Sequence, residues 1–214
     1  DSITYSYSWW VNGAEAETGT TLDVSDCLPG DSITVMITPN DGTTDGTALS
    51  SATVTVQNDA PTITSLNILP SAPATNDDLS VDFTTADADG DTVNSAVQWS
   101  VNGIVVSNTG ASLSSSLFSK NDTVTVQLTP SDVYDVGPAS IASVSIVNTA
   151  PMISGVDLGP TAPTIEDTLT CTANGWSDID GDSANYTYEW SINGASTVGA
   201  MTLDASTLSV GDTV

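Results

Sequence analysis

One short motif recurs three times along the chain, and its spacing constrains the fold more than any other feature. A Trp is followed within four residues by Asn-Gly, in the runs Trp10-Val11-Asn12-Gly13, Trp99-Ser100-Val101-Asn102-Gly103 and Trp190-Ser191-Ile192-Asn193-Gly194. An acidic run, Asp-x-Asp-Gly-Asp, keeps the same step of about ninety residues and occurs at Asp87–Asp91 and Asp178–Asp182. A fixed period of this length indicates a tandem array whose unit has the size of a small domain.

Laying the repeats over one another divides the chain into three parts. Residues 1–59 match the later part of a repeat and lack its opening strands, because Asp1 aligns with the last residue of each acidic run. Residues 60–149 are one complete repeat, and residues 150–214 match the opening part of a third. Two interpretations follow: the chain is an excerpt from a longer array, or other chains complete the outer parts head to tail by strand exchange.

Alternating apolar and polar residues indicate half-buried antiparallel strands and no helix. Val124, Val126 and Leu128, for example, share one face of a strand whose other face is polar. In the complete repeat we expect seven strands, near residues 62–69, 78–85, 94–101, 104–107, 111–115, 122–129 and 139–147. Seven short strands favour an all-β fold of immunoglobulin-like antiparallel β-sandwich domains in an extended array. Each Asn-Gly predicts a type I′ hairpin turn.

The chain resembles the tandem immunoglobulin-like, cadherin-like and PKD-like repeats of large bacterial and archaeal surface proteins. The resemblance rests on the Trp strand, the acidic run and the openings Asn58-Asp59-Ala60-Pro61 and Asn148-Thr149-Ala150-Pro151. The chain lacks the Gly-Asp-Gly of PKD repeats, and it also lacks the full linker of animal cadherins and their Asp-Arg-Glu motif. The resemblance implies an extracellular spacer or adhesin, often with calcium.

The same resemblance implies roles for the Trp and Cys residues. It places Trp10, Trp99 and Trp190 on the third strand of each repeat, buried against the core. Cys171 takes the place of an immunoglobulin-type cysteine whose partner position lies just beyond Val214, so it is either one half of a disulfide or a buried free thiol. Cys27 is expected to be a small core residue, and a bridge between Cys27 and Cys171 is not expected.

The charge of the chain excludes several classes of partner. The sequence has 27 acidic residues, one Lys, no Arg and no His, which gives a net charge of −26. Such a chain has nothing to neutralise phosphates, so it is not expected to bind nucleic acid or an anionic membrane surface. No run of residues approaches the length and apolarity of a membrane span, so direct membrane insertion of this segment is not expected.

The two acidic runs are the strongest candidates for a binding site. Carboxylates at alternate positions around a Gly favour a hard cation, and Ca²⁺ takes six to eight oxygen ligands. The loop between the second and third strands of such a sandwich lies at the pole that receives the linker. The expected ligands are therefore, at one joint, Asp87, Asp89, Asp91, Asn58, Asp59 and Asp132, and at the other Asp178, Asp180, Asp182 and Asn148. Asp26 and Asp31, or Asp77, Asp78 and Asp122, would face these sets. The alternative is that both runs are ordinary solvated turns.

These features favour a structural function over catalysis. Without His or Arg, the residues offer little for acid–base or nucleophilic chemistry, so the chain is not expected to be an enzyme. The leading hypothesis is a repeat segment of an extracellular stalk, fibre or adhesin shaft, stiffened by calcium at its domain joints. The alternative is a carbohydrate-binding or accessory module of a secreted polysaccharide-degrading enzyme, with aromatic side chains that stack on glycans. Further repeats, joined head to tail, are the expected partners.

Overall fold

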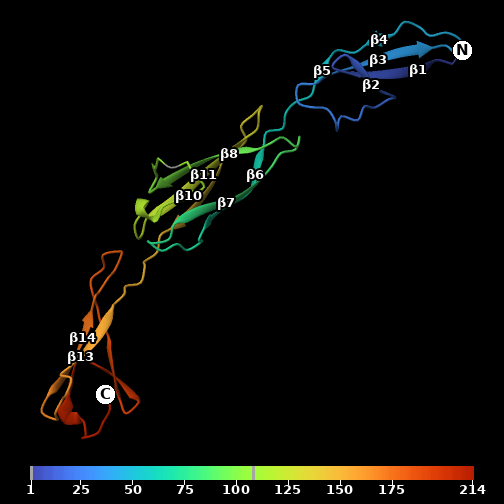
Figure 1. The fold of residues 1–214 in the computed structure, drawn as a ribbon. Helices are drawn as coiled ribbons and strands as arrows, with labels where there is room; N and C mark the ends of the chain where they lie inside the picture. The colour runs from blue at the N-terminus through green and yellow to red at the C-terminus, as the bar shows by residue number, and fades with distance from the viewer. Residues whose placement is uncertain (1, 108) are drawn as a thin grey trace. The chain divides into compact units, whose positions relative to one another are not determined.

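The computed structural model describes residues 2–107 and 109–214 and is nearly all β-structure (Figure 1). The chain divides into two compact units. One contains Asp1–Asn67, Val81–Gln98 and Val126–Ala142, and the other contains Ile68–Ser80, Trp99–Thr125 and Ser143–Val214. The central strands run through both units. The hydrogen-bonded strands nevertheless fall within residues 4–55, 62–145 and 155–204, and each sheet draws on only one of these ranges. Domain boundaries near 59/60 and 149/150 stay a prediction.

The first range forms a single antiparallel sheet. Its strands are β1 (Thr4–Val11), β2 (Ala14–Thr18), β3 (Ser32–Asn40), β4 (Leu49–Ser50) and β5 (Val54–Thr55), with the order β2-β1-β3-β4 and β5 also on β3. Among the described residues of this sheet only Ile33 is a buried apolar side chain, whereas Val35 and Ile37 on the same strand face are half-buried. One sheet layer by itself leaves a face of each strand in contact with water.

The central range has the seven strands that the alternation predicts. They are β6 (Thr62–Leu69), β7 (Leu79–Ala86), β8 (Asn94–Val101), β9 (Ile104–Val105), β10 (Ser112–Leu113), β11 (Thr123–Ser131) and β12 (Ser140–Ser145). They form two antiparallel sheets, β10-β7-β6 and β12-β11-β8-β9. The all-β sandwich prediction is confirmed, and the helical turns among the described residues are two short 3₁₀ segments, Ser115–Leu117 and Ala205–Thr207. None of the described helices is long and apolar enough to span a membrane.

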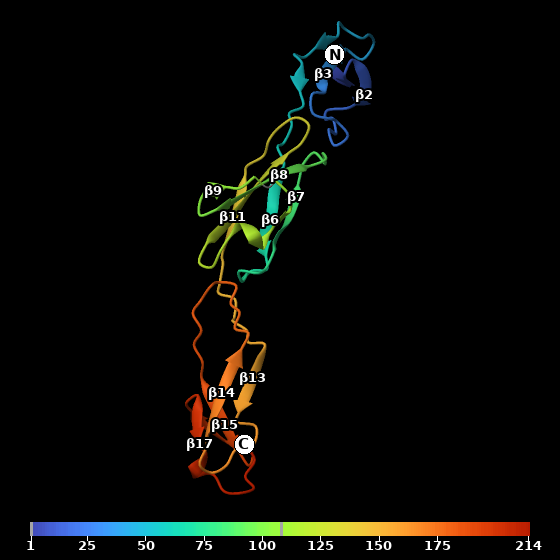
Figure 2. The same cartoon turned by 60° about the vertical axis from the view of Figure 1, so that its left-hand side comes forward.

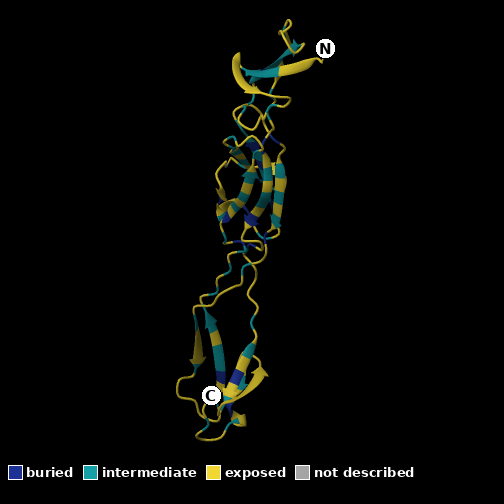
Figure 3. Cartoon of the chain, turned by 90° about the vertical axis from the view of Figure 1, so that its right-hand side faces the viewer, coloured by how far each residue is buried: buried dark blue, intermediate teal, exposed yellow. Residues whose placement is uncertain are grey.

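Most of the buried apolar residues belong to these central strands. Figure 3 colours the buried residues dark blue. Val124, Val126 and Leu128 are each 0% exposed, and the intervening residues of β11 are exposed or half-buried. Trp99 is also 0% exposed. The period-two prediction therefore identifies the inner face of β11 correctly, because alternate side chains of a strand point to opposite faces.

The third range contains two small sheets (Figure 2). One has the order β13-β14-β17, from β13 (Gly155–Gly159), β14 (Thr168–Asn174) and β17 (Thr202–Asp204), and the other pairs β15 (Tyr188–Ile192) with β16 (Ala195–Gly199). Leu169, Trp190 and Ala205 are its buried apolar residues. Cys171 lies on β14 opposite Leu158, and both it and Cys27 are half-buried free thiols.

Each Asn-Gly turn is fastened to a later Asp and to the residue after it by the same set of hydrogen bonds. In the central copy Asn102 Nδ2 donates to Asp122 Oδ1 at 2.7 Å, and Asn102 Oδ1 accepts from the Thr123 N–H at 2.9 Å. The other two copies repeat both contacts with Asn12 and with Asn193. Each Asn and the Gly after it have positive φ, as the type I′ prediction requires.

The structure corrects the alignment of the first Trp. The indole Nε1 of Trp99 donates to the carbonyl of Gly110 at 2.9 Å, and that of Trp190 donates to Ala200 at 3.0 Å. In the first copy Trp9, not Trp10, makes this contact, with Gly19 at 3.0 Å. The alignment of Trp10 with Trp99 and Trp190 is therefore wrong. The equivalent residue must lie three residues before the Asn of the turn in every copy, and in the first copy that residue is Trp9. Both Trp9 and Trp10 are half-buried, and the pairing of β1 with β2 shifts between them because Ala16 of β2 is an extra residue.

We expect Trp99→Ala to destabilise the folded chain by about 3–5 kcal/mol, the usual cost of removing a buried aromatic side chain. Chemical denaturation followed by circular dichroism measures the change in unfolding free energy. Ile104→Ala is the control, because Ile104 is 74% exposed in the hairpin that follows the same strand. If both substitutions change the unfolding free energy by the same amount, Trp99 is not a core residue.

We expect stability to fall in acid partly through Asp78, at the start of β7. The N–H of Ser115 donates to its carboxylate at 2.7 Å and holds the pKa of Asp78 below the ordinary 3.8. A lowered pKa adds stability above pH 3.8, and that stability is lost as the pH falls through the lowered value. The melting temperature of Asp78→Asn should therefore fall less steeply in acid than that of the native chain. The exposed Asp82→Asn is the control, and matching slopes for Asp78→Asn and the native chain would rule the contribution out.

Candidate metal centre

The first acidic loop, Asp87–Asp91, connects β7 to β8 and folds around one carboxylate. Asp87 Oδ1 accepts the backbone N–H groups of Asp89 and Asp91, both at 3.0 Å. Gly90 has a φ of +81°, a conformation that L side chains rarely adopt, so the sharp turn requires a glycine there. This arrangement keeps the three alternate aspartates of the loop on one tight turn.

The segment before β6 is tied to this loop. The N–H of Asp59 donates to Asp89 Oδ2 at 2.7 Å. The neighbouring Asn58 donates through Nδ2 to Asp132 Oδ2 and to Asp135 Oδ2, both at 3.1 Å. The two linker residues of the predicted ligand set therefore each contact a carboxylate of the same set, Asn58 at Asp132 and Asp59 at Asp89. All four residues lie within one compact unit.

Three oxygens at the first loop are buried and have no hydrogen-bond donor. They are Asn58 Oδ1, Asp87 Oδ2 and Asp91 Oδ2. Burial raises the pKa of Asp91, and the negative charges of Asp87, Asp132 and Asp89 raise it further. Buried acceptors without donors are costly, and neighbouring carboxylates repel one another. Amide and carboxylate oxygens are the ligands that Ca²⁺ prefers, so the chemistry of this donor set suits calcium. Among the described residues, however, only Asp178, Asp180 and Asp182 bring three carboxylates within 4.8 Å of one another.

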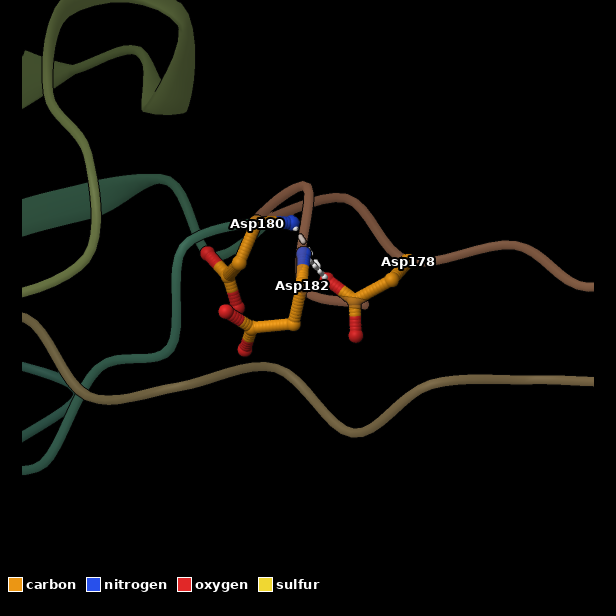
Figure 4. Close-up of side chains that lie close together, drawn as sticks. All are labelled: Asp178, Asp180 and Asp182. Carbon is orange, nitrogen blue, oxygen red and sulfur yellow. Dashed lines mark hydrogen bonds between the residues drawn. The ribbon is translucent and has the colours of Figure 1, made fainter. Parts of the chain in front are cut away.

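The second acidic loop, Asp178–Asp182, has the same internal structure (Figure 4). Asp178 Oδ1 accepts the N–H groups of Asp180 at 2.8 Å and Asp182 at 3.4 Å. One carboxylate oxygen from each of the three aspartates lies within 4.8 Å of the others. Asp178 Oδ2 is buried without a donor, as its counterpart in the first loop is.

The surroundings of the second loop differ from those of the first. Thr149 N–H donates to Asp180 Oδ2 at 2.7 Å, which repeats the contact that Asp59 makes in the first loop. The hydroxyl of Thr75 also donates to Asp180. This hydrogen bond is the main cause that lowers the pKa of Asp180, with smaller contributions from Thr149 and from the charge of Lys120.

Lys120 completes the second loop. Its Nζ donates to both carboxylate oxygens of Asp182 at 2.6 Å. This contact, followed by the charges of Asp182, Asp180 and Asp178, raises the pKa of Lys120 and keeps its ammonium protonated. The predicted ligand Asn148 is exposed, and its amide donates to the neighbouring carbonyl of Thr149 at 2.8 Å.

The aspartates expected to face the two loops have other roles. Asp31 and Asp122 accept the Asn-Gly clamps, Asp77 accepts the Ala74 N–H, and Asp78 accepts the Ser115 N–H. Sequence reasoning missed Asp135, Thr75 and Lys120. The sequence does contain a signal for Lys120, because a single basic residue among 27 acidic ones is expected to contact a carboxylate.

The aromatic side chains near the second loop pack against one another. Trp176 and Tyr186 meet edge to face at 85°, with ring centroids 5.6 Å apart, and Tyr186 and Tyr188 are tilted by 53°. All three residues are half-buried. Rings crossed in this way do not form the flat platform that stacking on a sugar requires, so this cluster does not favour the glycan-binding alternative.

Comparisons with known proteins identify no family. No protein-family model matches the chain, and no curated protein matches it. One similar solved structure is the crystal structure of the chicken CNTN1 FN1-FN3 domains, with 15% sequence identity and a TM-score of 0.33. The match covers 68% of this chain and 56% of that chain. A likeness of this degree carries no argument about function.

Proposed function

We propose that the chain is a repeat segment of an extracellular structural protein, a stalk, fibre or adhesin shaft, whose acidic loops bind calcium and stiffen the linkers between repeats. One repeated contact carries the proposal. In both acidic loops the central aspartate, Asp89 or Asp180, accepts the backbone N–H of the linker at 2.7 Å. The donors, Asp59 and Thr149, stand at equivalent places in the Asn-x-Ala-Pro openings.

This contact links cation binding to the position of the linker. An ion held by the loop carboxylates would attract Asp59 and Asn58 as well, because Asn58 Oδ1 is a buried acceptor with no donor. The linker and the loop would then be fixed together by one ion. Without a cation, Asp87, Asp89, Asp91 and Asp132 repel one another, as the raised pKa of Asp91 indicates.

The residues present define what calcium would do here. Asn58, Asp87 and Asp91 offer the unpartnered oxygens, while Asp89, Asp59 and Asp132 supply further carboxylates around them. A calcium ion would neutralise two negative charges in a chain with a net charge of −26. Extracellular modules typically bind calcium with dissociation constants of about 0.1–1 mM, which suits a site with this many partly exposed ligands.

We further propose that the partners of this segment are further copies of the repeat, joined head to tail in one array or contributed by other chains. In the central sheets the segment after β12 closes the domain: Val147 N–H donates to Pro73 at 2.8 Å and Ile146 N–H donates to Asp122 at 2.9 Å. In the third range, Pro163 and Asp212 stand at the positions of Pro73 and Asp122, and both line an open groove of about 690 Å³. The apolar side chains that line the same groove are Leu158, Ile165, Leu169, Leu208 and Val210. The strand equivalent to Ser140–Val147 would cover this groove, either as a further part of a longer array or as a strand of another copy of the repeat.

We expect calcium to raise the melting temperature of the chain relative to a chelator. The stabilisation follows RT ln(1 + [Ca²⁺]/Kd), about 2.7 kcal/mol at a hundredfold excess over Kd. Asp91→Asn should reduce the effect, whereas Asp82→Asn, which removes the same charge from an exposed position on β7, should leave it unchanged. If the native chain melts at the same temperature in calcium and in chelator, both loops are ordinary turns.

For the strand partner, we expect a synthetic peptide with the sequence of residues 140–149 to bind the chain, because it reproduces the strand that closes the central domain. Fluorescence anisotropy of a labelled peptide measures the binding, and a peptide of scrambled sequence is the control. Leu169→Ser, at the base of the groove, should weaken the binding. Equal anisotropy for the native and scrambled peptides would show that the groove does not bind this strand.

A further inference from the structure

The two acidic loops differ in one charged side chain. Lys120 is the only basic residue among the 214 of the sequence, and its ammonium contacts both oxygens of Asp182 at 2.6 Å. The Lys120 side chain is 25% exposed and that of Asp182 is 47% exposed. One cationic group is therefore already held against the second loop, where three carboxylates converge (Figure 4).

The first loop has no equivalent of this lysine. The turn that carries Lys120 recurs in each copy, because the Asp122 carboxylate accepts the N–H of Ser119 just as Asp31 accepts that of Leu28. This register places Pro29 at the position of Lys120. The first loop accordingly keeps three buried oxygens without donors, whereas the described residues of the second loop leave one, Asp178 Oδ2.

We propose that Lys120 serves as a built-in cation for the second acidic loop, and thereby directs calcium to the first loop and largely excludes it from the second. The proposal rests on the proposed function and narrows it, because calcium is then bound tightly at the first loop and not at both loops. One linker contact, at Asp59, then depends on calcium. The other, at Thr149, is supported by a side chain of the protein itself.

The physical reason is competition for the same oxygens. A divalent ion at the second loop would have to approach an ammonium that is hydrogen-bonded to both oxygens of Asp182, or displace it. Like charges a few ångströms apart near a protein surface repel by enough to weaken binding about tenfold or more. The Thr75 hydroxyl and the Thr149 N–H further occupy the Asp180 oxygens.

Isothermal titration calorimetry with calcium chloride tests the proposal on the full chain. The native chain should bind one ion tightly, at the first loop. Lys120→Gln should bind a second ion at the second loop, with an affinity at least about tenfold higher than that of the same loop in the native chain. Asp91→Asn should lose the tight ion. The double variant, with Lys120→Gln and Asp91→Asn together, should regain one ion, now at the second loop.

Two controls separate charge from structure. Lys120→Arg keeps the positive charge and should titrate like the native chain. Acetylation of the folded native chain removes the Lys120 charge without any change of sequence, and it should reproduce the second ion seen in Lys120→Gln. Circular dichroism confirms that each protein is folded before titration.

The outcomes distinguish the proposal from the function on which it rests. Two ions of similar affinity in the native chain, or identical titrations for the native chain and Lys120→Gln, overturn the role of Lys120 and leave calcium binding intact. No calcium binding by any of the proteins overturns both the proposed function and this inference.

Discussion

Hydrogen bonds from backbone N–H groups to aspartate side chains hold this structure together, because the chain has almost no basic side chains to pair with its acids. Each Asn-Gly clamp ends on an aspartate that also accepts an N–H of its own turn, as Asp122 does from Ser119. Asp87 and Asp178 organise the acidic loops in the same way. Charge-assisted bonds of this type are short and strong, so they can fix turns in a chain that repels itself.

The same constraint explains why the two acidic loops are the candidate binding sites of the chain. A loop that presents several carboxylates has more acceptor oxygens than nearby N–H groups can satisfy. In the second loop a lysine and a threonine hydroxyl supply additional donors. In the first loop Asn58 Oδ1, Asp87 Oδ2 and Asp91 Oδ2 remain buried without any donor. A metal ion can satisfy several such oxygens at once, and calcium suits their chemistry.

The sequence predicted what depends on local pattern and missed what depends on distant contacts. Alternation found the central strands and the buried face of β11, and Asn-Gly found the type I′ turns. Two adjacent indoles, Trp9 and Trp10, misled the alignment, because either one lies close before the Asn-Gly and only Trp9 keeps the spacing of three residues to the Asn found in the other copies. Lys120 and Asp182 are 62 residues apart, and no local pattern indicates that they meet.

Calcium binding at the first loop can be observed in a crystal structure of the chain grown in calcium, with anomalous difference density collected at long wavelength. We expect an ion within about 2.3–2.6 Å of Asn58 Oδ1, Asp87 Oδ2 and Asp91 Oδ2. We also expect the Lys120 ammonium to remain on Asp182. A structure with no density at the first loop, and with these three oxygens bonded to water or protein donors instead, would contradict calcium binding there.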